Sequence, residues 1–217
     1  MKRRQIRKST QAKRQRTRSG PITGALRIIG GKLRGSSLAY TGDPVTRPMK
    51  DRVREAVFNL IGPEIKGKHA IDLFAGTGAL GLEAISRGAS KATLIDRHFP
   101  SVDLIRQNIS DLSLENQAEA IATDAFYWSR QFSYDENLPL LLFCSPPYDM
   151  YLQQAEPLLD VLKLWIQRVG TSGMIVVESD TRFDHSLLPH PENWDVRTYA
   201  PAVVSILRMT NELRNIE

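Results

Sequence analysis

From about residue 68 the chain alternates short apolar runs with longer segments in which apolar residues recur at helical spacing. The short runs predict strands, because a strand that is buried on both faces is almost continuously apolar. The longer segments predict helices, because residues three and four positions apart share one helix face. Strands are expected at 70–74, 92–96, 118–122, 139–145 and 173–178, and helices at 79–87, 99–109 and 152–169. Repeated strand–helix units predict a mostly parallel sheet with helices on both faces.

Two flanking regions depart from this alternation. Residues 194–199 and 202–209 predict an antiparallel pair of strands that closes the sheet. Before the alternating region, residues 27–35 predict a β-hairpin, in which an apolar strand is followed by a Gly-Gly turn and a basic return strand. Residues 51–61 have the apolar spacing of an amphipathic helix, and a Gly-Pro pair ends it.

Composition favours a folded chain in a reducing setting. The 217 residues are 41% hydrophobic, which is enough to build a core and excludes wholesale disorder. The single cysteine, Cys144, excludes an internal disulfide, and its apolar neighbours predict a buried, inert thiol. The scattered histidines have no ligand spacing, so we expect no metal site. No apolar stretch approaches about 18 residues and none follows the basic N-terminus, so we expect no membrane span, no secretory signal and a cytoplasmic location.

Positive charge is concentrated in the first quarter of the chain. Residues 1–20 hold nine Lys or Arg and no acid, residues 21–54 hold seven bases against two acids, and the remainder has a net charge of −9. So much like charge with so few apolar residues predicts a disordered basic arm over 1–22. The arm is either a solvated tail or binds RNA phosphates, and the continuing basic bias favours RNA. The expected organisation is this arm, an RNA-facing hairpin and helix over 23–63, and a main domain over 64–213.

The most informative motif follows the first strand of the alternating region and has the sequence Asp72-Leu73-Phe74-Ala75-Gly76-Thr77-Gly78-Ala79-Leu80-Gly81. Glycine is needed where a backbone passes close to a ligand or takes a positive φ, and the helix that follows offers free N–H groups to polar ligand atoms. Its three glycines match the dinucleotide pattern G-x-G-x-x-G, and Asp96 lies 20 positions after Gly76, where an acid binds a ribose. The motif alone fits both an NAD-dependent enzyme and a methyl-transfer enzyme.

Acidic residues also mark the ends of the next two strands. Asp96 closes the second strand, and its carboxylate can accept from two ribose hydroxyl groups. Asp124, followed by Ala125, comes after the third strand, where an acid can accept from an adenine amino group. A lone Asp at a strand end is often only a helix N-cap. Three such sites at one edge of a parallel sheet favour a nucleoside cofactor.

The fourth strand ends in Ser145-Pro146-Pro147-Tyr148. Two prolines fix φ and remove backbone donors, which leaves carbonyl groups able to accept from a substrate. Tyr148 offers a ring face on which a base can stack. The alternative is a simple strand terminator followed by a core tyrosine. A dinucleotide dehydrogenase has no need of this tetrad, whereas an enzyme that methylates an amino group does, so the tetrad favours methyl transfer.

The glycine motif, the strand-end acids and the tetrad together resemble the pattern of S-adenosylmethionine-dependent methyltransferases. Residues 27–31 and 46–59 are more specific and are similar to the RsmD family, bacterial methyltransferases that act on the N2 amine of a guanine in 16S ribosomal RNA. The resemblance covers about residues 26–210. It implies a Rossmann-like class I methyltransferase fold, with a mostly parallel seven-stranded sheet, an antiparallel C-terminal strand and a small N-terminal β-hairpin and helix extension.

The resemblance also implies roles for residues. S-adenosylmethionine is expected to contact Asp72, Phe74, Ala75, Gly76, Thr77, Gly78, Asp96, Arg97, Asp124 and Ala125. The target guanine is expected to contact Ser145, Pro146, Pro147 and Tyr148. RNA is expected to contact Arg27, Lys32, Arg34, Arg47, Lys50 and Arg52. The expected partner is ribosomal RNA or an assembling small ribosomal subunit, bound by a monomer without a metal.

One residue departs from the family pattern, because the tetrad normally opens with Asp or Asn and here opens with Ser145. The guanine N2 amine is a poor nucleophile, and the side-chain oxygen and the Pro146 carbonyl are expected to accept its N–H groups. A neutral acceptor is about half as strong as an ionised one. Asp149 could replace the missing carboxylate but is expected to point away. The sequence favours an active guanine-N2 methyltransferase, and leaves open a catalytically weakened RNA- and cofactor-binding homologue or an amino methyltransferase for another base.

Overall fold

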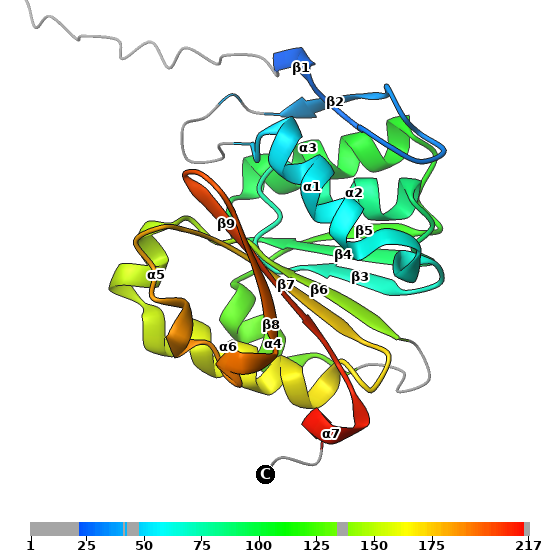
Figure 1. Cartoon of the computed structure of the whole chain (residues 1–217). Helices are drawn as coiled ribbons and strands as arrows, with labels where there is room; N and C mark the ends of the chain where they lie inside the picture. The colour runs from blue at the N-terminus through cyan, green and yellow to red at the C-terminus, as the bar shows by residue number, and fades with distance from the viewer. Residues whose placement is uncertain (1–21, 41, 43–47, 134–138, 215–217) are drawn as a thin grey trace, which may run out of the picture.

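The fold is built on one large twisted sheet (Figure 1). The structure is a computed structural model that describes residues 22–40, 42, 48–133 and 139–214. Seven strands lie in the order β5-β4-β3-β6-β7-β9-β8. The parallel strands are β3 (His69–Asp72), β4 (Lys91–Asp96), β5 (Ala118–Ala122), β6 (Leu140–Cys144) and β7 (Met174–Asp180). The antiparallel strands are β8 (Trp194–Tyr199) and β9 (Ala202–Arg208), with β9 paired to both β7 and β8.

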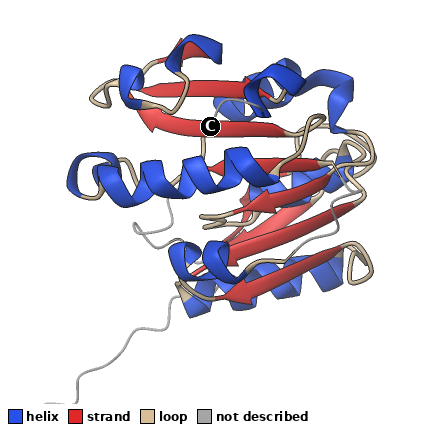
Figure 2. Ribbon diagram, turned by 90° about the horizontal axis from the view of Figure 1, so that it is seen from below, coloured by secondary structure: helices blue, strands red, loops and turns tan. Residues whose placement is uncertain are grey.

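Helices cover both faces of this sheet (Figures 1 and 2). One face carries α1 (Asp51–Ile61), α2 (Ala79–Ser86) and α3 (Phe99–Asp111). The other carries α4 (Ala125–Gln131), α5 (Asp149–Gln153) and α6 (Ala155–Arg168). The remaining helices are α7 (Asn211–Arg214) and the 3-10 helices η2 (Gly62–Ile65), η3 (His185–Leu187) and η4 (Pro191–Asn193).

Strand β6 shows why its sequence is apolar throughout. All five of its residues are buried, including Cys144 as predicted. Leu141 and Phe143 belong to the core cluster under α1, α2 and α3, whereas Leu142 and Cys144 belong to the cluster under α6. Successive side chains of a strand point to opposite faces, so a central strand covered on both faces needs apolar residues at every position.

The N-terminal segment packs as part of the same body. Strands β1 (Ile22–Arg27) and β2 (Ser37–Tyr40) form a two-stranded antiparallel sheet in which Leu26 faces Leu38. Both leucines are buried in the core cluster that also contains residues of α1, α2 and α3. Asn108 of α3 accepts from the backbone N of Ala39 and donates to its carbonyl oxygen, both at 2.8 Å.

The sheet is confirmed, with each predicted strand overlapping the observed one, but the hairpin prediction is wrong in detail. Apart from Arg27, its strands lie outside the predicted range, and residues 28–36 form the loop that joins β1 to β2. The Gly-Gly pair is used for close approach to the end of α2. Gly31 has a φ of 79°, and a Cβ at this position would overlap the carbonyl oxygen of Ser86. The backbone N of Lys32 donates to the same oxygen at 2.8 Å.

Two further element predictions need correction. The helix expected at 152–169 is divided into α5 and α6, because Gln154 leaves helical geometry with a φ of −138° and a ψ of 38°. Helix α4 was not predicted, and it begins at the N-cap Asp124.

Within the part of the chain that is described, no helix is long and apolar enough to cross a membrane. The arm predicted over residues 1–22 lies outside the described residues except for Ile22, which belongs to β1, and Arg47 also lies outside them.

Candidate active site

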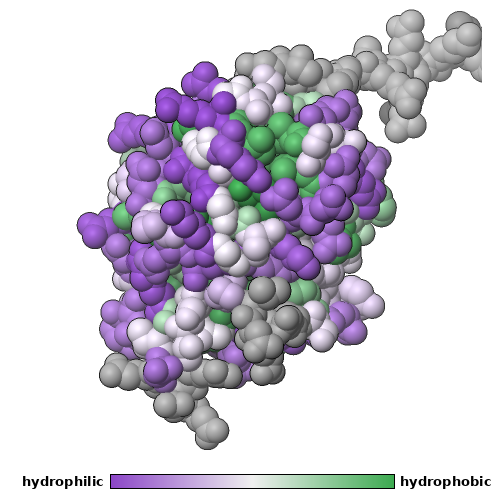
Figure 3. Space-filling view, turned by 90° about the vertical axis from the view of Figure 1, so that its right-hand side faces the viewer, coloured by the Kyte–Doolittle hydropathy of each residue, from purple (hydrophilic) through white to green (hydrophobic). Residues whose placement is uncertain are grey.

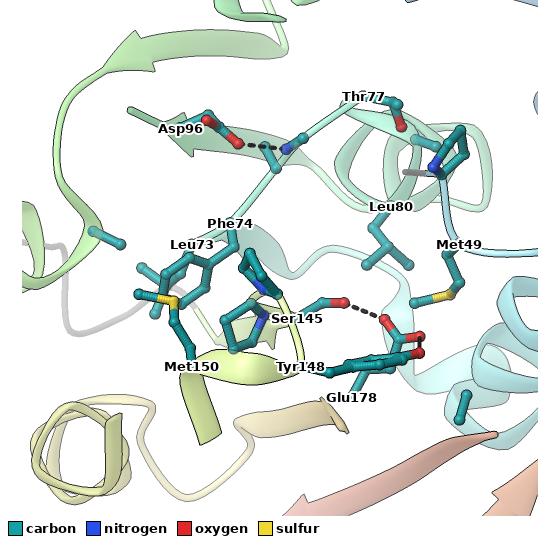
Figure 4. Close-up of a pocket in the computed structure, with 18 of the residues that line it drawn as sticks. Met49, Leu73, Phe74, Thr77, Leu80, Asp96, Ser145, Tyr148, Met150 and Glu178 are labelled. Carbon is teal, nitrogen blue, oxygen red and sulfur yellow. Dashed lines mark hydrogen bonds between the residues drawn. The ribbon is translucent and has the colours of Figure 1, made fainter. Parts of the chain in front are cut away.

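A cavity of about 550 Å³ opens at the carboxyl ends of the parallel strands (Figure 4). The strand order reverses between β3 and β6, which is where ligands of such sheets bind. The lining comes from the loops after β3, β4, β5 and β6, from the end of β7, from the residues before α1 and from the turn between β8 and β9. This volume is sufficient for a ligand of cofactor size.

The glycine loop forms one wall of the cavity. Phe74, Ala75, Gly76 and Thr77 line it, whereas Gly78 lies behind them. Gly78 is the N-cap of α2 and has a φ of 77°, and a Cβ there would lie 2.9 Å from a side-chain carbon of Ile105 in α3. Glycine therefore allows the chain to turn from β3 into α2 while packed against α3.

Asp96, at the end of β4, is held by two backbone groups. Its Oδ2 accepts from the N of Gly76 at 2.7 Å (Figure 4). Its Oδ1 accepts from the N of His98 at 2.8 Å. Each carboxylate oxygen has a further lone pair. Arg97 and His98 line the cavity beside it. The carboxylate is thus positioned to accept from the hydroxyl groups of a ribose.

Asp124 is both the N-cap of a helix and a residue of the cavity lining. Its Oδ1 accepts from the N of Tyr127 at 2.9 Å, which makes it the N-cap of α4. Asp124 and Ala125 also line the cavity, next to the loop that carries Asp96. The cap bond holds the side chain of Asp124 in a defined position at the edge of the cavity.

Asp72 lies beneath the cavity wall, contrary to expectation. It is 1% exposed, and among the described residues neither carboxylate oxygen has a hydrogen-bond partner of normal geometry. Burial raises the pKa of Asp72 to about 7, with Asp96 and Glu178 adding to the rise and the backbone amides of Gly81 and Phe74 opposing it. Asp72 and Gly78 are the two predicted cofactor residues that do not line the cavity.

The structure brings all four residues of the tetrad to the cavity. They follow β6, which lies between β3 and β7. The hydroxyl of Ser145 donates to Oε2 of Glu178, and the hydroxyl of Tyr148 donates to Oε1 at 2.7 Å (Figure 4). The tetrad is therefore more than a strand terminator, since two of its side chains are fixed by one buried carboxylate.

Glu178 is the main functional candidate that was not predicted from the sequence. It lies on β7, lines the cavity and is 6% exposed. Burial raises its pKa, and the hydrogen bonds from Ser145 and Tyr148 partly oppose the rise. The signal in the sequence was an acid that follows a run of apolar residues at a parallel strand's carboxyl end, the same signal that identified Asp96.

Asp149 also lines the cavity, but its carboxylate is engaged by Arg182 at 2.9 Å. Arg182 pairs with Asp180 as well, at 2.7 Å. Other lining residues that were not predicted include Met49, Leu80, Met150 and Tyr199. Among the residues described, no group of three or more His, Cys, Asp or Glu side chains could hold a metal ion.

The predicted RNA-binding residues divide between two edges of the sheet. Lys50 lines the cavity, and Arg27 pairs with Asp51 at the start of α1. Lys32 instead contacts Gln117, which precedes β5, so the loop with Lys32 and Arg34 lies at the amino-terminal edge. Figure 3 shows the side of the molecule where this loop lies, with hydrophilic side chains around a smaller hydrophobic area. All the described members of the set, Arg52 included, are exposed.

Comparison with known proteins identifies the family. Residues 26–205 match the family model described as Conserved hypothetical protein 95. The Ribosomal RNA small subunit methyltransferase D of Escherichia coli K12 is 34% identical over 174 residues, which cover 80% of this chain and 83% of that protein. The chain belongs to the RsmD family.

Two further proteins, each named a putative methyltransferase, are similar to this chain. The Bacillus subtilis protein YlbH is 35% identical over 155 residues, or 71% of this chain and 83% of that one. The solved structure of the Escherichia coli protein yhhF has a TM-score of 0.66 and 30% identity, and the match covers 88% of this chain and 100% of that chain. The expected family and the class I methyltransferase fold are therefore confirmed.

Proposed function

We propose that this RsmD-family protein transfers a methyl group from S-adenosylmethionine to the N2 amine of a guanine in small-subunit (16S) ribosomal RNA. The observation that carries the proposal is that the Ser-Pro-Pro-Tyr tetrad and the fixed carboxylate of Asp96 line one cavity. A nucleoside cofactor and a planar base can therefore occupy neighbouring parts of the same space. The name of the Escherichia coli relative supports ribosomal RNA as the substrate.

The residues around the glycine loop fit S-adenosylmethionine. Asp96 offers acceptors to the ribose hydroxyl groups, and Asp124 with Ala125 offers polar groups to the adenine edge. The wall from Phe74 to Thr77 would lie along the methionine part. When bound, the cofactor supplies an electrophilic methyl group on a positively charged sulfur.

The tetrad would hold the guanine and orient its amine. Tyr148 is anchored through its hydroxyl to Glu178, so its ring has a fixed position against which a base can stack. The hydroxyl oxygen of Ser145 and the carbonyl of Pro146 would accept the two N–H groups of the amine. Such an orientation directs the nitrogen lone pair toward the methyl group, and correct placement is a large part of the catalytic effect.

Basic residues next to the cavity would bind the RNA on either side of the target base. Lys50 lies in the cavity wall, and Arg52 follows it at the start of α1. Arg27 is on the strand that packs near this helix. We assign Lys32 and Arg34 to more distant phosphates, and we assign Arg47 and the arm over 1–22 to RNA phosphates without a place relative to the cavity. Each phosphate contact adds affinity that falls as salt increases.

The direct test uses purified protein, S-adenosylmethionine with a labelled methyl group, and small subunits or 16S RNA that lack the modification. We expect the label in N2-methylguanosine after digestion of the RNA to nucleosides. RNA that already carries the modification serves as the control and should accept no label. Label in an adenine amine, or no label despite cofactor binding, would contradict the proposal.

Ser145 motivates a second candidate function, in which the protein binds RNA and cofactor but transfers methyl groups weakly. A wild-type protein that binds both ligands without transfer, and gains transfer in Ser145→Asp, would favour this candidate. Loss of one well-placed acceptor costs roughly 10²–10³-fold in rate. The hydrogen bond from Ser145 to a buried carboxylate argues for the active enzyme, because the site still contains an ionisable acceptor.

A further inference from the structure

Glu178 lies on the strand next to the tetrad and is bound by two of its side chains. Ser145 donates to one carboxylate oxygen and Tyr148 to the other. Strands β6 and β7 are parallel neighbours in which Cys144 pairs with Val177. The residues that follow these two, Ser145 and Glu178, therefore lie side by side at the cavity (Figure 4). Glu178 is 6% exposed and lines the same space as the tetrad.

The hydrogen bond to Glu178 determines what Ser145 can offer to a substrate. A hydroxyl group has one proton and two lone-pair sites. Because the proton of Ser145 is directed at Glu178, the hydroxyl presents lone pairs to any other partner. An acceptor is what an amine N–H group requires. The neutral serine and the buried carboxylate therefore form one unit with the acceptor character of the Asp or Asn that the family pattern has at this position.

We propose that Glu178 is the final proton acceptor of the methyl-transfer reaction and that Ser145 relays the proton to it, an inference that rests on the proposed function. As the amine nitrogen bonds to the methyl carbon, the methyl–sulfur bond breaks with its electron pair left on sulfur. The nitrogen gains a positive charge. One of its protons passes to the oxygen of Ser145 while the proton of Ser145 passes to Glu178. Protonated Glu178 returns its proton to solvent after the methylated base leaves.

Groups on the neighbouring elements set the proton affinity of Glu178. Burial raises its pKa, and the hydroxyl groups of Ser145 and Tyr148 lower it. Asp72 on β3 and Tyr151 on α5 also interact with it. A carboxylate whose pKa lies above the ordinary value is a stronger base at neutral pH than an exposed one. Glu178 acts through Ser145, so it is a positioning residue.

The pH dependence of single-turnover methyl transfer to 16S RNA tests this role. The wild-type rate should fall at acidic pH as Glu178 becomes protonated. Glu178→Gln should be slower by about 10²–10³-fold and should lose this inflection. Its affinity for S-adenosylmethionine should not change, and a cooperative thermal transition shows that the variant is folded. Glu119→Gln makes the same change at an exposed position on β5 and should keep the wild-type rate and profile.

Moving the carboxylate supplies a positive test. The double variant Glu178→Gln/Ser145→Asp carries its carboxylate at the tetrad, where it can receive the amine proton directly. We expect the rate to recover by at least about tenfold over Glu178→Gln, which corresponds to about 1.4 kcal/mol of activation free energy. A residue with a purely structural role could not be replaced by a carboxylate at another position, so absence of any recovery counts against the relay.

A third measurement does not depend on catalysis. Carboxyl-labelled glutamate gives an NMR titration of the protein alone, with the Glu178 signal identified by its loss in Glu178→Gln. Ser145→Ala should raise the pKa of Glu178 further, because the lost hydrogen bond favours the charged form. An unchanged titration, or wild-type rate and profile in Glu178→Gln, overturns the relay and leaves the proposed function standing. No transfer by wild-type protein overturns both, whereas transfer to an adenine amine overturns only the guanine assignment.

Discussion

Arg54 of α1 and Glu83 of α2 form an ion pair that is completely buried. Nε of Arg54 lies 2.9 Å from Oε2 of Glu83, and both side chains are 0% exposed. Glu83 also pairs with Arg87 at 2.8 Å, and Arg54 donates to the carbonyl oxygen of Arg27 at 2.7 Å. These contacts join β1, α1 and α2, so the ion pair holds the basic N-terminal segment against the large sheet.

Removal of one partner should therefore destabilise the whole protein. Glu83→Ala removes the buried carboxylate from Arg54 and leaves only the partly exposed carboxylate of Asp51, 3.0 Å away, as its ionic partner. Removing one partner of a buried ion pair costs about 3–5 kcal/mol in the free energy of unfolding. Urea denaturation measures this loss. Asp160→Ala is the matched control, because it breaks the exposed pair between Asp160 and Lys163 and should leave the unfolding midpoint nearly unchanged. Equal midpoints for the two variants would show that the buried pair is not important for stability.

The same ion pair shows what the sequence could and could not predict. The bounds of α1 follow from its apolar spacing, and the structure confirms residues 51–61. That spacing cannot place Arg54 on the buried face, because its partner lies 29 positions away in another helix. The bonds of Glu178 to Ser145 and Tyr148 escaped prediction for a similar reason, since they depend on the pairing of β6 with β7. Local pattern predicts elements, whereas contacts between elements require the assembled sheet.

Asp72 should make stability depend on pH. Its folded pKa of about 7 lies above the value of about 3.9 for an unfolded chain. Protonated Asp72 therefore contributes stability that is complete below about pH 4 and is lost as pH rises through 7, at a slope on the order of 1 kcal/mol per pH unit. Asp72→Asn cannot ionise, so its melting temperature relative to wild type should increase between pH 4 and 8. Asp103→Asn, on an exposed side chain, should follow the wild-type curve, and a parallel curve for Asp72→Asn would refute the prediction.

Asp96 should contribute strongly to cofactor affinity. Asp96→Asn removes the negative charge of a carboxylate that accepts from the backbone N–H groups of Gly76 and His98. The same carboxylate faces the proposed ribose position. Loss of charged hydrogen bonds costs about 1.5–3 kcal/mol, so the Kd for S-adenosylmethionine should rise roughly 10–100-fold. Isothermal titration calorimetry gives this value directly, and Asp103→Asn again provides the same change away from the cavity. An unchanged Kd in Asp96→Asn would remove the ribose assignment.

The two groups of basic residues should differ in their effect on RNA. Lys50 lies in the cavity wall and Arg52 is close to it in α1, whereas Lys32 and Arg34 lie on the loop at the opposite edge of the sheet. In Lys50→Ala/Arg52→Ala, RNA binding should weaken, the salt dependence should fall by about two phosphate contacts, and the rate of methyl transfer should drop because the target base is less well placed. Lys32→Ala/Arg34→Ala removes the same charge. The salt dependence of binding should again decrease, while the rate of methyl transfer on saturating RNA stays unchanged. Filter binding at several salt concentrations and transfer at saturation separate the two effects. Equal rates in both double variants would mean that the cavity edge has no special part in positioning the RNA.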